Sequence, residues 1–135
     1  MNLARMPWLF MPRPMLTHNV QPIAVADLCD AIVRLMQSDA RGIVELGGPR
    51  PLTMAALVAS LRQQMGMRAT MVQPLPVSIT RLSARCGDYV SVSPWCSASL
   101  EMASHDNCCD PQTAADALGR ATIAPEHLLA TLTRL

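Results

Sequence analysis

The sequence predicts an α/β fold that contains a piece of a partly parallel sheet. Its 135 residues are enough for one domain of ordinary size. Half of the residues are hydrophobic and 16% are charged, a balance that argues against intrinsic disorder. Short apolar runs alternate with segments of helical periodicity, in the order strand, helix, strand, helix, strand and several helices. This alternation is typical of α/β packing, but three short strands are too few for a complete doubly wound sheet.

Each predicted strand is a short apolar run that ends at turn residues. These runs are residues 22–25, 43–46 and 69–72. Residues 1–19 precede them and are interrupted by prolines, so we expect an irregular proline-rich lead-in followed by a folded unit over residues 20–135.

The predicted helices are bounded by recognisable start and stop residues. Asp27, Thr53 and Asp110 stand where helix N-caps are expected, each just before apolar residues at helical spacing. Gly66 and Gly119 stand where two of these helices should end. A short helix is expected before Gly87 and a last one after Pro125, so the second half of the chain should be mainly helical.

The composition excludes several function classes. All eleven basic residues are arginines, so no Schiff-base lysine, P-loop lysine or Tyr–Lys catalytic pair is encoded. The net charge of +1 gives no electrostatic signature of nucleic-acid binding. Five cysteines, an odd number, indicate reduced thiols and a cytoplasmic location. No apolar run approaches the roughly 18 residues of a transmembrane helix, so we expect no membrane span.

Several short motifs occur in a characteristic order along the chain. They cover residues 21–28, 45–49, 52–53, 74–76 and 106–110. Together they resemble the C-terminal portion of atypical, extended short-chain dehydrogenase/reductase proteins, from about Pro12 to the end of the chain. The resemblance is to the branch that includes NAD(P)-binding epimerase/dehydratase-like proteins and the accessory dehydrogenase-like subunit of respiratory complex I.

The resemblance implies a C-terminal fragment of a Rossmann-like fold that lacks the nucleotide-binding half. In that family the preceding half carries a glycine-rich dinucleotide loop and, in active members, a Tyr-x-x-x-Lys pair. The six glycines here form no such loop, and Tyr89 is followed four residues later by Ser93. The resemblance therefore implies NAD(P) for full-length relatives, but no catalytic or cofactor-binding residue in this chain and no catalysis by the chain alone.

Residues 21–27 resemble a family motif in which a strand enters a helix at the floor of the active-site cleft. Ala24 replaces the usual histidine, Ala26 replaces an aspartate of the atypical branch, and no arginine precedes the motif. The missing arginine casts doubt on a nucleotide-sugar substrate, because arginine is the preferred bidentate partner of phosphate.

Four residues are expected nearest a substrate pocket by this resemblance: Gln21, Ile23, Val25 and Pro76. For Gln21, a contact with solvent or backbone is an equally good interpretation. Asp27 is interpreted as a helix cap.

Other features suggest chemistry but have plainer explanations. Residues 105–110 are rich in His, Asp and Cys, but no second spaced pair completes a zinc site, and a loop with a helix cap is expected. A cysteine nucleophile would need a histidine from elsewhere in the chain. Gly47 and Gly48 follow a predicted strand as a phosphate loop would, but a tight connection is favoured, since the next prolines lack N–H donors. Met71 and Met102 are candidate lining of an apolar cleft, although methionine more often fills a core.

The sequence thus predicts a truncated substrate-side lobe of an oxidoreductase- or epimerase-like protein. The alternative is a non-catalytic interaction or assembly module, for which the complex I subunit is the precedent by resemblance. An isolated lobe should expose apolar surface, so we expect self-association or docking to a Rossmann half. No metal is expected.

Overall fold

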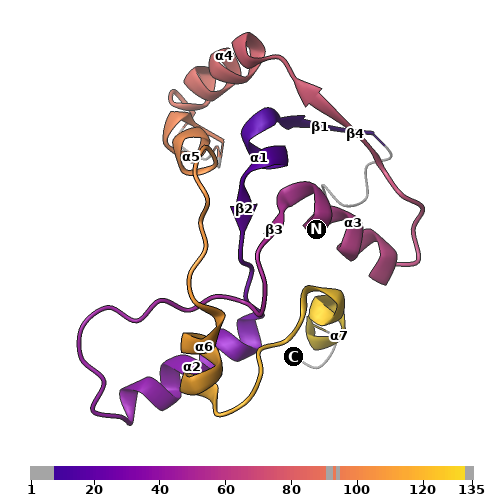
Figure 1. The fold of residues 1–135 in the computed structure, drawn as a ribbon. Coiled ribbons are helices and arrows are strands. Elements are labelled where there is room, and N and C mark those ends of the chain that lie inside the picture. The colour runs from indigo at the N-terminus through magenta and orange to yellow at the C-terminus, as the bar shows by residue number, and fades with distance from the viewer. Residues whose placement is uncertain (1–7, 91–92, 94, 133–135) are drawn as a thin grey trace.

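A parallel pair of strands, β1 (Trp8–Pro12) and β4 (Met71–Leu75), forms one of two small sheets in this computed structural model. The structure describes residues 8–90, 93 and 95–132. Trp8 lies beside Met71 and Pro12 beside Leu75 (Figure 1). The third predicted strand, residues 69–72, is thus present but is shifted toward the C-terminus. The sheet is parallel, as expected, but its second strand, β1, is not one of the predicted strands.

The second sheet pairs β2 (Asn19–Val20) with β3 (Leu52–Thr53) in antiparallel orientation. Helices make up most of the remaining regular structure, so the predicted α/β class is confirmed. They are α1 (Arg13–Thr17), α2 (Val25–Met36), α3 (Met54–Gln64), α4 (Val77–Gly87), α5 (Ser97–Met102), α6 (Pro111–Leu118), the 3-10 helix η2 (Pro125–His127) and α7 (Leu128–Leu132).

The hydrophobic core lies between β1 and α3. Side chains alternate across a strand, so Leu9 and Met11 point inward while Phe10 between them is exposed. Val58 of α3 completes this buried cluster. The helix begins as the sequence predicts, because the Thr53 hydroxyl accepts a hydrogen bond from the Ala56 N–H at 3.2 Å.

A second packing unit joins α2 and α6, at the opposite end of the molecule from α4 (Figure 1). Small side chains allow a close approach, and both Ala31 and Ala114 are fully buried. The Asp110 carboxylate accepts the Gln112 N–H at 2.9 Å, and Gly119 ends α6 with φ +66°. The predicted boundaries of α6 are therefore confirmed.

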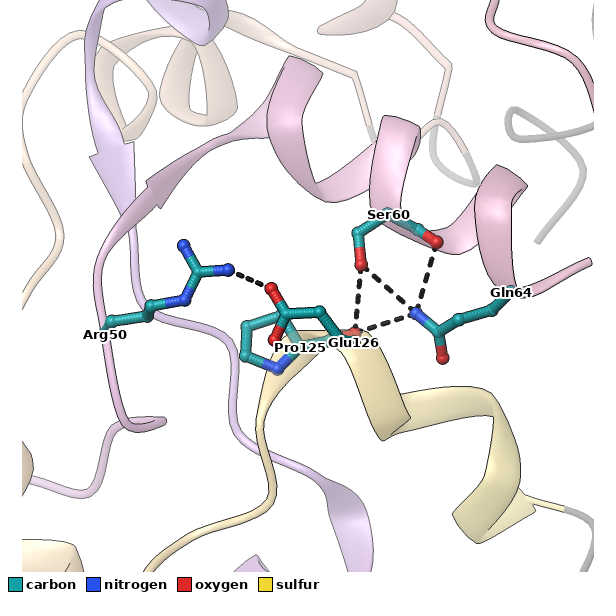
Figure 2. Close-up of polar contacts among 5 residues, drawn as sticks. All are labelled: Arg50, Ser60, Gln64, Pro125 and Glu126. Atoms are coloured by element: carbon teal, nitrogen blue, oxygen red, sulfur yellow. Dashed lines mark hydrogen bonds and ion pairs between the residues drawn. The ribbon is translucent and has the colours of Figure 1, made fainter.

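The segment near the C-terminus is attached to α3 through the Pro125 carbonyl and through the Leu129 N–H, which donates to Gln64 Oε1 at 2.9 Å. Gln64 and Ser60 donate hydrogen bonds to the Pro125 oxygen at 2.8 and 3.2 Å (Figure 2). Arg50 forms an ion pair with Glu126 beside this carbonyl. These contacts hold η2 against α3, although more than sixty residues separate Gln64 from Pro125 along the chain.

The predicted irregular lead-in is wrong where the structure describes it, from residue 8 to residue 19. This stretch contains β1 and α1, and its prolines occupy positions that regular structure tolerates. Pro12 is the last residue of β1, and Pro14 lies in the first turn of α1, where N–H groups have no partner within the helix. Residues 1–7 lie outside the described residues. The boundary at residue 20 remains a prediction.

Two of the predicted strands are absent. Residues 22–24 lead directly into α2, whose first residue is Val25. Residues 43–46 lie in the long connection between α2 and β3, and within the described part of the chain no strand pairs with them. An apolar run forms a strand only where another strand completes its hydrogen bonds, and neither run has such a neighbour here.

Candidate functional site

The side chain of Gln21 joins three segments that are distant in the sequence. Its Nε2 donates to the Gly48 carbonyl at 2.7 Å, and its Oε1 accepts the Cys109 N–H at 3.0 Å. The Gly48 N–H also donates to the Gln21 carbonyl at 3.4 Å. Three of the motifs quoted from the sequence therefore meet at one place, and Gln21 does contact the backbone.

Gly47 and Gly48 allow this close approach. A Cβ atom on Gly48 would lie 2.0 Å from the Pro22 carbonyl oxygen, and one on Gly47 would lie 2.6 Å from the Cys109 sulfur. Gly48 therefore requires glycine, because the obstacle is backbone, whereas a side chain at Gly47 would have to displace the side chains of Cys109 and Gln21. Close packing explains the glycine pair and favours the tight connection over a phosphate loop.

A cavity of about 440 Å³ opens beside Gln21. Its volume falls within the roughly 300–1,000 Å³ of small-molecule sites. Polar side chains and thiols share the lining with aliphatic ones. The lining residues are Val20, Gln21, Pro22, Glu45, Leu46, Gly47, Met54, Leu57, Asn107, Cys108 and Cys109. We refer to it as the Gln21 cavity.

The wall of the Gln21 cavity formed by residues 106–109 is fixed by Asp106. Its Oδ1 accepts the Asn19 N–H at 2.7 Å, and the Asn107 N–H donates to the Asn19 carbonyl at 2.9 Å. The backbone N–H of Asn19, assisted by His18 at 3.4 Å, lowers the pKa of Asp106. The carboxylate thus anchors a loop. Among the described residues, no group of three or more His, Cys, Asp and Glu side chains could hold a metal ion.

Cys109, one of the two cysteines in this wall, is not activated as a nucleophile. Cys109 is half-buried, and this burial raises the pKa of its thiol, with a smaller contribution from the Glu45 carboxylate. A raised pKa keeps the sulfur in its protonated, weakly nucleophilic form at neutral pH. The raised pKa therefore argues against covalent catalysis by Cys109.

Of the four predicted pocket residues, only Gln21 lines the cavity. Ile23 lies just beyond Pro22. Val25 is an exposed residue in the first turn of α2, and Pro76 is the exposed N-cap of α4. The structure does not bring these four together, and their contact with a substrate remains a prediction.

The cavity residues missed by the sequence prediction lie in motifs that had already been noted. Glu45 and Asn107 belong to the segments 45–49 and 106–110. Both segments are among the motifs quoted from the sequence, and this was the signal that could have placed Glu45 and Asn107 near Gln21. Met71 and Met102, the candidate cleft methionines, are both exposed and do not line the cavity.

Asp27 has a different role from the predicted helix cap. Ala24 is the N-cap of α2, and Asp27 lies inside the first turn with 0% of its surface exposed. Its Oδ2 accepts the Ile123 N–H at 2.6 Å, and Arg120 Nη2 lies 2.7 Å from its Oδ1. The Asp27 carboxylate raises the pKa of Arg120. The residue therefore fastens the segment after α6 to α2.

A second cavity, of about 330 Å³, lies between β1, α1, α3 and β4. Its lining is apolar and includes Phe10, Met15 and Trp95. Met54, at the start of α3, lines this cavity and the Gln21 cavity alike.

Comparison with known proteins identifies the fold. No protein-family model matches the chain, and no curated protein matches its sequence. Among solved structures, the chain is similar to the NADPH-dependent quinone oxidoreductase QOR2 of Escherichia coli, with a TM-score of 0.70 and 16% identity. The same enzyme in complex with NADPH matches with a TM-score of 0.70 and 15% identity. The chain thus has part of the Rossmann-like α/β fold of these structures.

The similarity extends over only part of these enzymes. It covers 98% of this chain but 48% and 47% of the two QOR2 chains. The chain therefore spans about half the length of the solved structures that it matches. Separately, no helix in the described ranges has the length and apolar character needed to cross a membrane.

Proposed function

We propose that this chain is the substrate-side lobe of an NAD(P)-dependent oxidoreductase- or epimerase-like protein. The observation that carries the proposal is the fold match, in which nearly the whole chain corresponds to about half of an NADPH-dependent oxidoreductase. The motif order adds support for the C-terminal portion of an atypical short-chain dehydrogenase/reductase, in the branch of the complex I accessory subunit.

In this proposal the residues that line the Gln21 cavity form one wall of the substrate pocket. The Gln21 amide uses one donor and one acceptor for the backbone contacts, which leaves a second N–H for a ligand. No arginine is among the described lining residues, and Glu45 contributes a negative charge. A neutral substrate without phosphate fits this wall better than a nucleotide sugar does.

The cofactor would be bound by a separate nucleotide-binding half. QOR2 has been solved with NADPH, whereas this sequence contains neither a glycine-rich dinucleotide motif nor a lysine. The proposal therefore assigns pocket shaping to this chain and hydride transfer to the assembled protein. It includes a cytoplasmic location, because all five cysteines are free thiols.

Thermal unfolding with and without NADPH tests this division of roles. A ligand present at a hundred times its Kd stabilises a fold by about 2.7 kcal/mol, which would raise the Tm of a domain this size by roughly 10 °C. We expect 1 mM NADPH to leave the Tm of this chain unchanged, with QOR2 as the positive control. A rise of several degrees would show that the chain binds the cofactor by itself and would overturn the proposal.

A second candidate function is a non-catalytic assembly module. Large apolar side chains of α2, among them Val33 and Met36, are exposed, as expected of a helix that packs against another protein. NADPH oxidation in the presence of a quinone separates the two candidates when it is measured on this chain together with its nucleotide-binding half. Turnover supports the oxidoreductase lobe, and its absence in a complex that binds NADPH supports the assembly module.

A further inference from the structure

The cavity between β1, α1, α3 and β4 is a site of its own. It has a volume of about 330 Å³, and we call it the Trp95 cavity. The buried core residues Leu9, Met11 and Val58 are part of its lining. Met54 is the one described residue that it shares with the Gln21 cavity. The proposed substrate pocket therefore does not account for this space.

The lining of the Trp95 cavity selects an apolar ligand. Among its described lining residues no side chain carries a charge, and the indole N–H of Trp95 is the one polar side-chain group. That N–H already donates to the Ser83 hydroxyl at 3.1 Å. A polar ligand would give up its hydrogen bonds to water and find no side-chain partner in return, which is costly.

Trp95 is held in place by contacts outside the cavity. Besides the bond from its indole to Ser83, its backbone carbonyl accepts the Ser93 hydroxyl at 2.9 Å, and its N–H donates to the same hydroxyl at 3.3 Å. Gly87, the last residue of α4, leaves no room for a Cβ atom beside the Trp95 carbonyl. An aromatic wall that is already fixed loses little conformational freedom when a ligand binds.

The Trp95 cavity reaches the carboxyl ends of the two parallel strands. Pro12 ends β1 and Leu75 ends β4; the two residues are paired in the sheet, and both line the cavity. Met15, from the helix that follows β1, lines it as well. Ligands of open α/β sheets bind beyond the carboxyl ends of parallel strands, where the chain turns away into the next element.

The size and the side chains of the Trp95 cavity indicate the kind of apolar ligand. A cavity of about 150 Å³ holds one benzene molecule, so roughly twice that volume holds two fused rings. Met11, Met15 and Met54 are part of the lining. Thioether sulfurs make favourable contacts with the edges of aromatic rings, and methionine adapts its shape to them. The Trp95 ring adds a surface for stacking or edge-to-face contact.

We propose that the Trp95 cavity binds an uncharged aromatic molecule of two fused rings, at a site distinct from the Gln21 cavity. Burial of the rings among the methionine and aliphatic side chains provides the affinity, and contact with Trp95 provides the preference for an aromatic ligand. The inference uses only the residues around this cavity and does not depend on the proposed function.

A titration of the full chain with naphthalene tests the proposal. Nuclear magnetic resonance of isotope-labelled methionine methyl groups reports on ten positions along the chain, each assigned by single substitution. We expect saturable shifts at Met11, Met15 and Met54, and no shift at the exposed Met36 and Met102. 1-Naphthoate carries the same rings with a carboxylate, and we expect it to bind at least tenfold more weakly.

Substitutions with a matched control locate the site. Met15→Trp fills the cavity, whereas Met65→Trp adds the same bulk at another half-buried methionine, which packs on the same core but does not line the cavity. We expect the first to weaken naphthalene binding about tenfold or more and the second to change it less than about twofold. Trp95→Ala removes the aromatic wall without adding bulk and should weaken binding roughly fivefold. Far-UV circular dichroism verifies the folding of each variant.

The outcomes that would overturn the proposal are distinct. Absence of saturable shifts would show that the cavity takes no such ligand, and equal shifts at Met36 and Met102 would show adsorption to exposed apolar surface. Equal affinity of folded Met15→Trp and Met65→Trp variants would place the binding elsewhere. Equal affinity for naphthalene and 1-naphthoate would overturn the ligand class. None of these results bears on the thermal unfolding with NADPH that tests the proposed function.

Discussion

The β1–α3 region and the α2–α6 region are stabilised in different ways. The first buries Leu9, Met11 and Val58 in a shared apolar core. The second packs small side chains around the ion pair between the buried Asp27 and the half-exposed Arg120, and leaves apolar side chains of α2 such as Val33 and Met36 in solvent. Apolar burial holds the first region together from within, whereas specific polar contacts hold the second. The β1–α3 region therefore buries its apolar side chains against one another, whereas the α2–α6 region leaves apolar side chains of α2 exposed.

The largest effect is expected in the apolar core. Leu9→Ala should lower the free energy of unfolding by about 3 kcal/mol, because it removes a buried side chain and leaves a cavity. Phe10→Ala, on the exposed side of the same strand, should change it by less than about 1 kcal/mol. Urea unfolding followed by circular dichroism measures both. Equal losses would show that β1 does not bury Leu9 selectively.

A smaller effect is expected from the polar contacts of the second region. Arg120→Ala should cost about 2 kcal/mol, since Asp27 is fully buried and would lose its cation, while the partial exposure of Arg120 moderates the loss. Asp30→Ala removes the exposed carboxylate near the same arginine and should cost about 0.5 kcal/mol or less.

A double-mutant cycle checks the assignment of this pair. Asp27→Asn in the Arg120→Ala background removes the uncompensated charge, so the two losses should not add. Additive losses would mean that Asp27 and Arg120 contribute independently, and the contrast between the two regions would then fail.

The smallest effect concerns the loop anchored by Asp106. Its pKa is lowered in the folded state, as is that of Asp88, which accepts hydrogen bonds from Ser97. Such carboxylates stabilise the fold above their unfolded pKa of about 3.9, and this contribution disappears as the pH falls through the lower folded value. The Tm should therefore stay level from about pH 7 to pH 5 and decline below about pH 4.

Differential scanning calorimetry across this pH range measures the decline. The Asp106→Asn variant should lose less Tm on acidification than the unmodified chain, because it lacks one of the titrating groups. A Tm that increases on acidification would contradict the assignment.

The features predicted correctly depend on short-range signals. Thr53 and Asp110 cap helices through N–H groups only two or three residues away, so the sequence shows both partners at once. Gly66 and Gly119 adopt positive φ just after their helices, a conformation that glycine tolerates best. The α/β class also follows from a local pattern, the alternation of apolar runs and helical segments, although the parallel pair uses β1, which was expected to be irregular.

The features predicted wrongly depend on distant partners. Aspartate is a residue type that often caps helices. The actual partners of Asp27, however, are Arg120 and the Ile123 N–H, more than ninety residues away. Residues 43–46 resemble a strand, but nothing in the described chain pairs with them. The Gln21 cavity was anticipated only at Gln21, because its other walls come from segments that folding alone brings together.

The position of Met54 has a consequence for ligand binding. A flexible thioether side chain that lines two cavities cannot adapt to a ligand in one without changing the shape of the other. A ligand that moves Met54 in one cavity would therefore be coupled to binding in the other, and such a coupling acts equally in both directions. An apolar molecule lodged between β1 and α3 would alter the affinity of the Gln21 cavity for its own ligand by the same factor as the reverse.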